Sequence, residues 1–473
     1  MNSDGQVILA QLERANLFVI PLDDSRRWYR YHHLFADLLQ NVLRQRRSAE
    51  QIGELHRCAG KWYQAEGLPG EAMSHILDAR DFEWAASLIE ENIAGLIHLF
   101  SRDKTPMILN WIERLPESVR RSHPSLEVYR ASMLALNLEL DEVELILSKV
   151  EKQIDPDAPR GGEMLGHIAA VRAYTANLRG NAASAIEMAA LAKKFIPGET
   201  DLTAVGIVAY TLADTYFAAD DMANARRELI EMLGICEKAG QLLLIVPALC
   251  DLAAINRVEG RLHQAEELYG RAYRWLTKRN ALETRVRCSF EFGMADLLRE
   301  RNQLDAAYEH AITGIRQCAR LGGYQMIGDL PLMRVFQARG DVKGAMKALL
   351  DAEQAAWPHP FQLAMMLEFK TARVRQWLAV GDVETAHRWA KECNGGSEQE
   401  QIVLARLLLA QGRAEEAGYL LNRQQAQAEA GGRNGRLIEI LILQALALAC
   451  QKTNQEKALS ALDQALGLAE PEG

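Results

Sequence analysis

Gly180-Asn-Ala-Ala-Ser-Ala185 is the first full copy of a pattern that returns along the chain. In each copy, Gly or another turn-forming residue is followed five positions later by Ala. Gly ends a helix at low steric cost in a left-handed conformation, and the small Ala lets two antiparallel helices approach closely. Each copy therefore predicts a helical hairpin. The other copies begin at Gly260, Gly340, Gly381 and Gly412, with weaker ones at Gly67, Asp220, Asn302 and Thr453.

The spacing of the copies predicts a repeat array. From Ala185 onward, successive Ala positions lie 31 to 42 residues apart. Apolar residues at helical spacing follow each turn, and no hairpin can bury such a face alone, so neighbours must stack. The turns resemble those of tetratricopeptide repeats, with a period lengthened from ~34 to ~40 residues. We expect an all-α, right-handed superhelix of antiparallel helix pairs over residues 156–473.

Two regions precede the expected array. Two prolines and two glycines over residues 155–162 predict a loop, and residues 56–155 read as an irregular helical connecting region. Within residues 1–55, two apolar stretches, 17–22 and 28–31, flank a polar turn and predict a β-hairpin. A helix is expected from His33 to about Arg46. A hairpin beside helices is typical of the end of a winged-helix domain.

Composition favours a soluble binding protein over an enzyme. The chain is 49% hydrophobic and carries a net charge of −9, which makes it, as a whole, a poor ligand for nucleic acid. Its seven cysteines are dispersed and form no CxxC pair, so we expect reduced thiols and a cytoplasmic location. No stretch has the length and apolarity of a membrane span. Without catalytic groupings or zinc-type spacings, we expect no enzymatic activity, no metal and no cofactor in this chain.

Three segments resemble the large ATP-dependent regulators of the MalT type, within the LuxR group. They are LERANLFVIPLDDSRRWYRYHHLFADLLQNVLRQR (residues 12–46), WIERLPE with HPSL (111–117 and 123–126), and LGLAEPEG (466–473). The resemblance implies a nucleotide-binding domain, a winged helix, a tetratricopeptide-like sensor and a DNA-binding helix-turn-helix, in that order. This sequence covers only the middle and holds no G-x4-G-K-[ST] phosphate loop. We expect an excised part of such a parent rather than a naturally shortened relative.

The same resemblance implies roles that lie outside this sequence. ATP or ADP and self-association are implied for the intact parent, and DNA contact only through its C-terminal domain. His32 aligns with the His of a Met-His-Asp-like motif that contacts nucleotide phosphate in related proteins. The third position is His33 rather than Asp. The alternative, that His32 caps the following helix or packs in the wing, stays open.

The first helix of each pair is expected to line a groove, and fixed offsets from the turns select the residues that would face it. Arg334, Arg375 and Arg406 would form a ladder suited to carboxylate or phosphate, with acidic and aromatic residues nearby. The alternative is that the charged residues form salt bridges between repeats and the aromatics fill helix seams. The predicted groove residues are Tyr174, Tyr210, Asp214, Phe217, Arg257, Phe292, Asp296, Arg299, Arg334, Gln337, Arg375 and Arg406.

Two functions remain open from the sequence. In the first, the chain senses and relays an effector for a MalT-type regulator, by binding a small-molecule inducer or an inhibitory protein. In the second, it is a stand-alone tetratricopeptide scaffold that binds a peptide or a protein partner. The segment 12–46 favours the first function, because a lone scaffold has no need of part of a winged helix.

Overall fold

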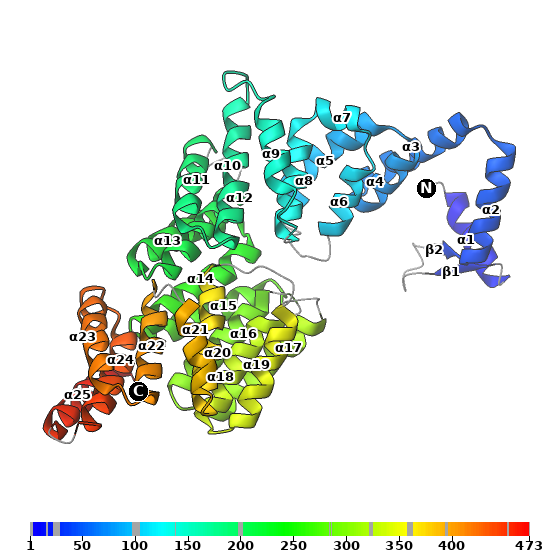
Figure 1. Ribbon diagram of the computed structural model, residues 1–473. Coiled ribbons are helices and arrows are strands. Elements are labelled where there is room, and N and C mark those ends of the chain that lie inside the picture. Colours follow the sequence, from blue (N-terminus) through cyan, green and yellow to red (C-terminus); the bar gives the residue numbers. More distant parts are fainter. Residues whose placement is uncertain are drawn as a thin grey trace. The chain divides into compact units, whose positions relative to one another are not determined.

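The computed structural model describes most of the chain as helix. The described residues are 3–15, 18–21, 29–96, 105–137, 139–196, 202–282, 284, 286–320, 325–356, 363–392, 396–451 and 454–472. The chain divides into two compact units (Figure 1), which are Met1–Asn92 with Asn110–His123, and Ile93–Leu109 with Pro124–Gly473. The predicted all-α class, with a tetratricopeptide-like array and a small hairpin, is confirmed.

The first unit carries the predicted hairpin. Strand β1 (Val19–Pro21) pairs antiparallel with β2 (Tyr29–Tyr31), and α2 (His33–Arg46) follows with the predicted bounds. The turn predicted over residues 23–26 lies outside the described residues. The other helices that fall wholly or partly in this unit are α1 (Ser3–Arg14), α3 (Ala49–Ala65), α4 (Pro69–Asp78), α5 (Phe82–Leu96), α6 (Thr105–Glu113) and α7 (Glu117–Ser122).

The second unit is the helical array, and consecutive helices from α10 onward pack as antiparallel pairs, beginning with α10 and α11. Helix α10 begins at Gly161, so both glycines of the predicted loop belong to its first turns, and the loop ends at Arg160. The helices are α8 (Pro124–Leu136), α9 (Val143–Glu151), α10 (Gly161–Leu178), α11 (Ala182–Phe195), α12 (Leu202–Ala218), α13 (Met222–Ala239), α14 (Leu242–Val258), α15 (Leu262–Lys278), α16 (Val286–Glu300), α17 (Leu304–Arg320), α18 (Gln325–Ala338), α19 (Val342–Ala356), α20 (Leu363–Ala379), α21 (Val383–Glu392), α22 (Glu398–Ala410), α23 (Ala414–Ala430), α24 (Asn434–Ala449), α25 (Gln455–Ala469) and the short η2 (Glu470–Glu472).

The repeated turn has the conformation that its residues predict. Gly180, Gly260, Gly340, Gly381 and Gly412 all have φ between 74° and 80°. At the first of these turns, the Gly180 N–H bonds to the Asn177 carbonyl and the Asn181 N–H bonds to the Ala176 carbonyl, at 2.9 Å each. This pair of bonds is a Schellman motif, which satisfies the last carbonyls of the helix. The Ala residues of the pattern are buried between the paired helices, and Ala185, Ala225 and Ala265 are fully buried.

The residue after the turn position starts the next helix. The Asn181 side chain accepts a hydrogen bond from the Ser184 N–H, and the Asp221 side chain accepts one from the Asn224 N–H. Such N-caps satisfy backbone donors that the first turn of a helix leaves open, and each contributes about 1 kcal/mol. One short stretch of sequence therefore ends one helix and begins the next, which explains why the pattern predicts the array so well.

The array also folds back on itself, which the local pattern did not predict. The first helices of distant pairs pack against each other, α12 against α20 and α14 against α24. The turn before α15 approaches the start of α24 so closely that a Cβ on Gly435 would lie 2.3 Å from the Arg257 carbonyl oxygen. One pair earlier, the Glu398 N–H at the start of α22 donates to Asp220 at 2.7 Å. We call these contacts the closure.

Asp220 shows how the closure shapes the sequence. It occupies the left-handed turn position, with φ of 59°, where the stronger copies of the pattern have Gly. An Asp is less favourable there than Gly, but unlike Gly it has a side-chain oxygen that can accept the Glu398 N–H at the start of α22. Burial raises the pKa of Asp220, because the charged form loses solvent. The carboxylate thus serves a long-range contact at some cost to the local turn.

We expect Gly435→Ala to destabilise the second unit by roughly 1–3 kcal/mol, because the new Cβ would collide with backbone that cannot move without opening the closure. Gly418→Ala is the matched control, since Gly418 lies within helix α23 and a Cβ there meets nothing within 4 Å. Its expected effect is a stabilisation of up to ~1 kcal/mol from helix propensity. Urea unfolding followed by circular dichroism measures both, and equal stability of the two variants would refute the closure.

Candidate functional site

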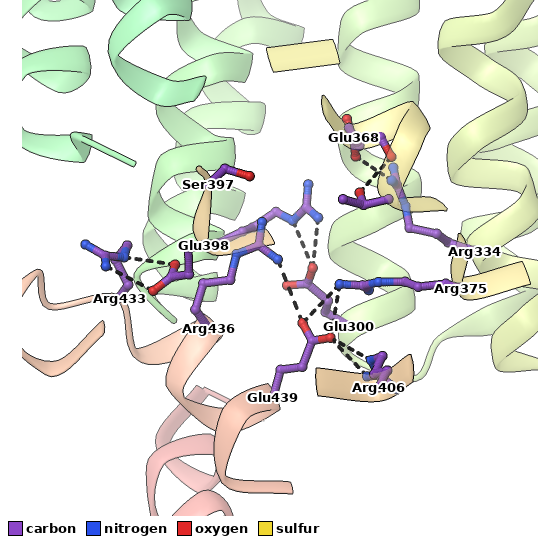
Figure 2. Close-up of polar contacts among 12 residues, drawn as sticks. Glu300, Arg334, Glu368, Arg375, Ser397, Glu398, Arg406, Arg433, Arg436 and Glu439 are labelled. Carbon is purple, nitrogen blue, oxygen red and sulfur yellow. Dashed lines mark hydrogen bonds and ion pairs between the residues drawn. The ribbon is translucent and has the colours of Figure 1, made fainter. Parts of the chain in front are cut away.

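The first helices of the array carry two charged clusters. The mixed cluster consists of three arginines and three acidic residues from α14, α16, α18 and α20. The arginine cluster consists of Arg375, Arg406, Arg436 and Glu439, from α20, α22 and α24. Figure 2 shows side chains of both. The mixed cluster is Arg257, Arg299, Arg334, Asp296, Glu300 and Glu368.

Asp296 is the centre of the mixed cluster. It accepts two hydrogen bonds from Arg334, at 2.8 Å from Nε and 2.6 Å from Nη2, and Arg257 lies 3.6 Å away. Arg334 also pairs with Glu368. The Asp296 residue is 6% exposed, and although burial acts to raise its pKa, Arg334, Arg257 and Arg299 hold that pKa well below its usual range.

The mixed cluster is balanced in charge and links four neighbouring first helices. Arg257 donates to Glu300 at 2.8 Å, and Arg299 lies 3.0 Å from the same carboxylate. Three positive and three negative side chains leave no net charge. Pairs of this kind are the salt bridges between repeats that the structural alternative expected of Arg257 and Arg334. A buried carboxylate with bidentate pairing is costly to break, because the remaining charges lose their partners.

The arginine cluster is not balanced. Glu439 Oε1 lies 3.0 Å from Arg375 Nη2 and accepts a hydrogen bond from Arg406 Nη2 at 2.9 Å. Arg436 Nη1 lies 3.8 Å from the other oxygen of the same carboxylate. Burial acts to raise the pKa of Glu439, but the three arginines lower it to about 2. One carboxylate therefore faces three guanidinium groups, with an excess of two positive charges.

The excess charge affects Arg375 most. Glu439 raises the pKa of Arg375, but burial and repulsion from Arg406, Arg436 and Arg334 outweigh it and leave that pKa below the usual value. The Nε atoms of Arg375 and Arg436 are buried, and neither has a hydrogen-bond partner in the described part of the chain. Buried donors without partners are uncommon in proteins and carry a desolvation penalty.

A third group lies on α12 and α14. The Tyr210 hydroxyl hydrogen-bonds Asp251, and Asp214 accepts a hydrogen bond from Asn177 at 2.9 Å. Burial and the neighbouring Asp214 raise the pKa of Asp251 to about 7, although Tyr210 acts to lower it. The charge on Asp251 raises the pKa of Tyr210 well above its usual value, with burial adding to the effect.

The structure brings some of the predicted groove residues together and separates others. Arg375 and Arg406 meet on Glu439, but Arg334 belongs to the mixed cluster, so the predicted ladder is two clusters. Gln337 donates to Gln376 at 2.7 Å. Phe292, 5% exposed, lies in a core with Cys288 and Cys318, and Phe217 packs against another core, as the alternative for the aromatics expected. Tyr174 lies half-buried on α10.

Sequence reasoning missed Arg436 and Glu439. Both lie near the start of α24, far from the turn offset that selected Arg375 and Arg406. Glu439 reaches Arg406 because α22 and α24 are neighbouring first helices, and it reaches Arg375 two first helices away on α20. Gly435, directly before Arg436, was one available clue, since Gly permits close backbone approach.

His32 in the first unit lies directly before α2, and its side chain does not cap that helix. Its ring lies 4.3 Å from that of His33. The packing alternative fits this position, and the nucleotide-sensing role stays a prediction. Over the described residues, no helix has the length and apolarity needed to cross a bilayer, and no three His, Cys, Asp or Glu side chains gather as metal ligands would.

We expect Asp251→Asn to change how stability depends on pH. The folded-state pKa of about 7 lies above the unfolded value of ~3.9, so the native protein loses stability as pH rises from about 4 to 7. The variant removes that penalty and should be more stable than the parent chain by on the order of 2 kcal/mol at pH 8, with little difference at pH 4. Urea midpoints at both pH values measure it. Asp463→Asn, at an exposed position on α25, is the control, and parallel pH profiles for all three proteins would contradict the expectation.

Known proteins share this architecture. Residues 1–51 match the family described as MalT winged helix domain, and residues 166–473 match the family described as MalT-like TPR region. Among solved structures, a Rap protein complexed with competence and sporulation factor is 14% identical, with a TM-score of 0.53 over 74% of this chain and 98% of that one. RapI in its apo form is 11% identical, with a TM-score of 0.41 over 76% and 96%. With about two thirds of its length matched by the array's family and the matching winged-helix segment ahead of it, the chain belongs to the family of MalT-like TPR regions.

Proposed function

We propose that this chain is the effector-sensing and relay region of a MalT-type regulator, and that a small molecule binds on the first helices of the array. The observation that carries the proposal is the contact between distant first helices, α12 with α20 and α14 with α24. A ligand held by residues of these first helices acts on a surface where distant pairs of the array already meet. Its binding can therefore shift the equilibrium between a closed and a more open arrangement.

The closure favours a small ligand over a bound helix or long peptide. Where first helices of distant pairs pack together, their inner surfaces are occupied by each other and by the charged clusters. The Rap protein of similar fold is complexed with competence and sporulation factor, which supports the idea that such an array can take up a separate factor. Neither closely packed helices nor a balanced mixed cluster suggests catalysis, so the change that the ligand causes is one of conformation.

Ligand binding can change the closure because the residues that would hold the ligand lie next to those that make the closure. Arg436 and Glu439 lie within one turn of Gly435, whose backbone contacts the turn before α15. At the far end of the array, the His263 N–H and ring on α15 contact Glu472 of η2 at 2.8 Å. A ligand that reorients the side chains of α24 therefore acts directly on the contact that holds the array closed. Sensing requires different affinities of the ligand for the two arrangements.

A thermal-shift screen of the chain against a metabolite library tests the proposal. A ligand at 100 times its dissociation constant should stabilise the native state by about 2.7 kcal/mol. We expect its effect to disappear in at least one of Asp214→Asn, Gln337→Ala and Arg406→Ala, and to persist in Arg413→Ala, which removes a guanidinium from an exposed pair with Glu416. Hydrogen exchange should slow at residues 433–440 and 259–264 when the ligand binds.

Two results would contradict the sensor function. A stabilising ligand that is indifferent to every one of the inner substitutions would bind elsewhere. If a ligand binds through those residues but leaves hydrogen exchange at the closure unchanged, its binding does not change the contacts that hold the array closed. A library with no stabilising member would rule out the small-molecule form and shift the function to an inhibitory protein partner.

A further inference from the structure

The arginine cluster has charge that the protein itself does not neutralise. Arg375, Arg406 and Arg436 share a single carboxylate, Glu439. Each of these four side chains is between 19% and 36% accessible, so the cluster is screened from bulk solvent but open to small solutes. Guanidinium groups held together against their repulsion represent stored electrostatic free energy, which an anion would release.

The surrounding charged groups do not remove the excess. Arg334 adds to the repulsion felt by Arg375, and its own charge is engaged by Asp296 and Glu368. Asp220 has a favourable electrostatic interaction with Arg436, but its carboxylate already accepts the Glu398 N–H. Glu398 itself is paired with Arg433 at 2.9 Å, as Figure 2 shows. These acidic groups, from the turn after α12 and from α16, α20 and α22, are therefore committed to other partners.

The cluster also has donors to spare. The buried Nε atoms of Arg375 and Arg436 lack hydrogen-bond partners over the residues that the structure covers. Arg436 contributes only a long ion pair of 3.8 Å to Glu439, which is beyond hydrogen-bond length. Planar guanidinium groups present paired N–H donors that match the oxygens of phosphate and carboxylate. Three such groups from three helices can surround one compact anion.

We propose that Arg375, Arg406 and Arg436 form a binding site for a compact dianionic group, with the geometry of a phosphate monoester, and that Glu439 acts as its internal competitor. A dianion matches the excess of two positive charges and supplies acceptors for the unpartnered donors. When it binds, Glu439 gives up part of its hold on Arg375 and Arg406. Since Glu439 lies one turn from the closure, the exchange links anion binding to the array's arrangement.

Titration of the chain with inorganic phosphate tests the site, by calorimetry at pH 7.5 and at constant ionic strength maintained with chloride. We expect saturable binding that weakens about tenfold in each of Arg375→Gln, Arg406→Gln and Arg436→Gln, which corresponds to the loss of one charge-assisted hydrogen bond. Glu439→Gln should bind phosphate about fivefold more tightly, because it removes the competitor while raising the excess charge. The matched control Arg413→Gln should stay within about twofold of the parent chain.

Substitution of Arg436 should weaken phosphate binding, whereas substitution of its neighbour Glu439 should strengthen it. A general loss of folding would weaken binding in both variants, so the opposite signs separate the site from misfolding. Arg436→Lys keeps the positive charge and should fold and retain part of the phosphate affinity if Arg436→Gln proves unstable. The site is overturned if phosphate binds no better than chloride, if the arginine variants and Arg413→Gln respond alike, or if Glu439→Gln weakens binding. Thermal unfolding with and without phosphate provides the baseline for each variant.

This inference deepens the proposed sensor function by naming the chemical class of its effector, and the two can fail separately. A neutral metabolite that binds through Tyr210 or Asp214, in a chain that binds phosphate no better than chloride, would preserve the sensor and remove the anion site. Phosphate binding with the expected variant pattern, but without altered hydrogen exchange at the closure, would preserve the anion site and remove the relay.

Discussion

The close approach between the turn before α15 and the start of α24 determines what this array can do. Gly260 and Gly435 allow two stretches of backbone 175 residues apart to meet where any side chain on Gly435 would collide with a carbonyl oxygen. The same end of α24 carries Arg436 and Glu439, which meet Arg375 of α20 and Arg406 of α22 in a site that no single repeat contains. The second closing contact, from Asp220 to the Glu398 N–H, repeats the arrangement one pair earlier.

The two charged clusters are built from similar residues but differ in what they contribute. In the mixed cluster, three carboxylates balance three arginines. The nearly fully buried Asp296 links α16 to α14 and α18 through Arg257 and Arg334. Its role in stability is explained by pairing alone. In the arginine cluster, Glu439 satisfies three cations only in part, and the pKa of Arg375 falls although a carboxylate lies 3.0 Å away. A protein that needed only stability would gain from a second carboxylate there. Its absence from the described residues around the cluster fits a site that is kept ready for an external anion.

The sequence predicted most of the fold because the array is built by local rules. Gly180 and its counterparts set the helix ends, Asn181 and Asp221 start the next helices, and both effects act within a few residues. The site was predictable only in part. Arg334, Arg375 and Arg406 share a turn offset, and the structure pairs the last two with Glu439 but Arg334 with Asp296. Phe292 has the offset of a groove residue but fills a core, because Gly314 and Gly328 leave room for its ring. Arg436 and Glu439 lie near the start of α24, at positions that the turn offsets did not select.

A crystal structure of this chain grown in phosphate would test the anion site most directly at the arginine cluster. We expect a tetrahedral anion in contact with at least two of Arg375, Arg406 and Arg436, which accepts a hydrogen bond from Arg375 Nε. Glu439 should be withdrawn from at least one of its present partners, with the turn at Gly260 still in contact with Gly435. Glu439 bonded to Arg375 and Arg406 as it is here, with no anion beside it at saturating phosphate, would contradict this expectation.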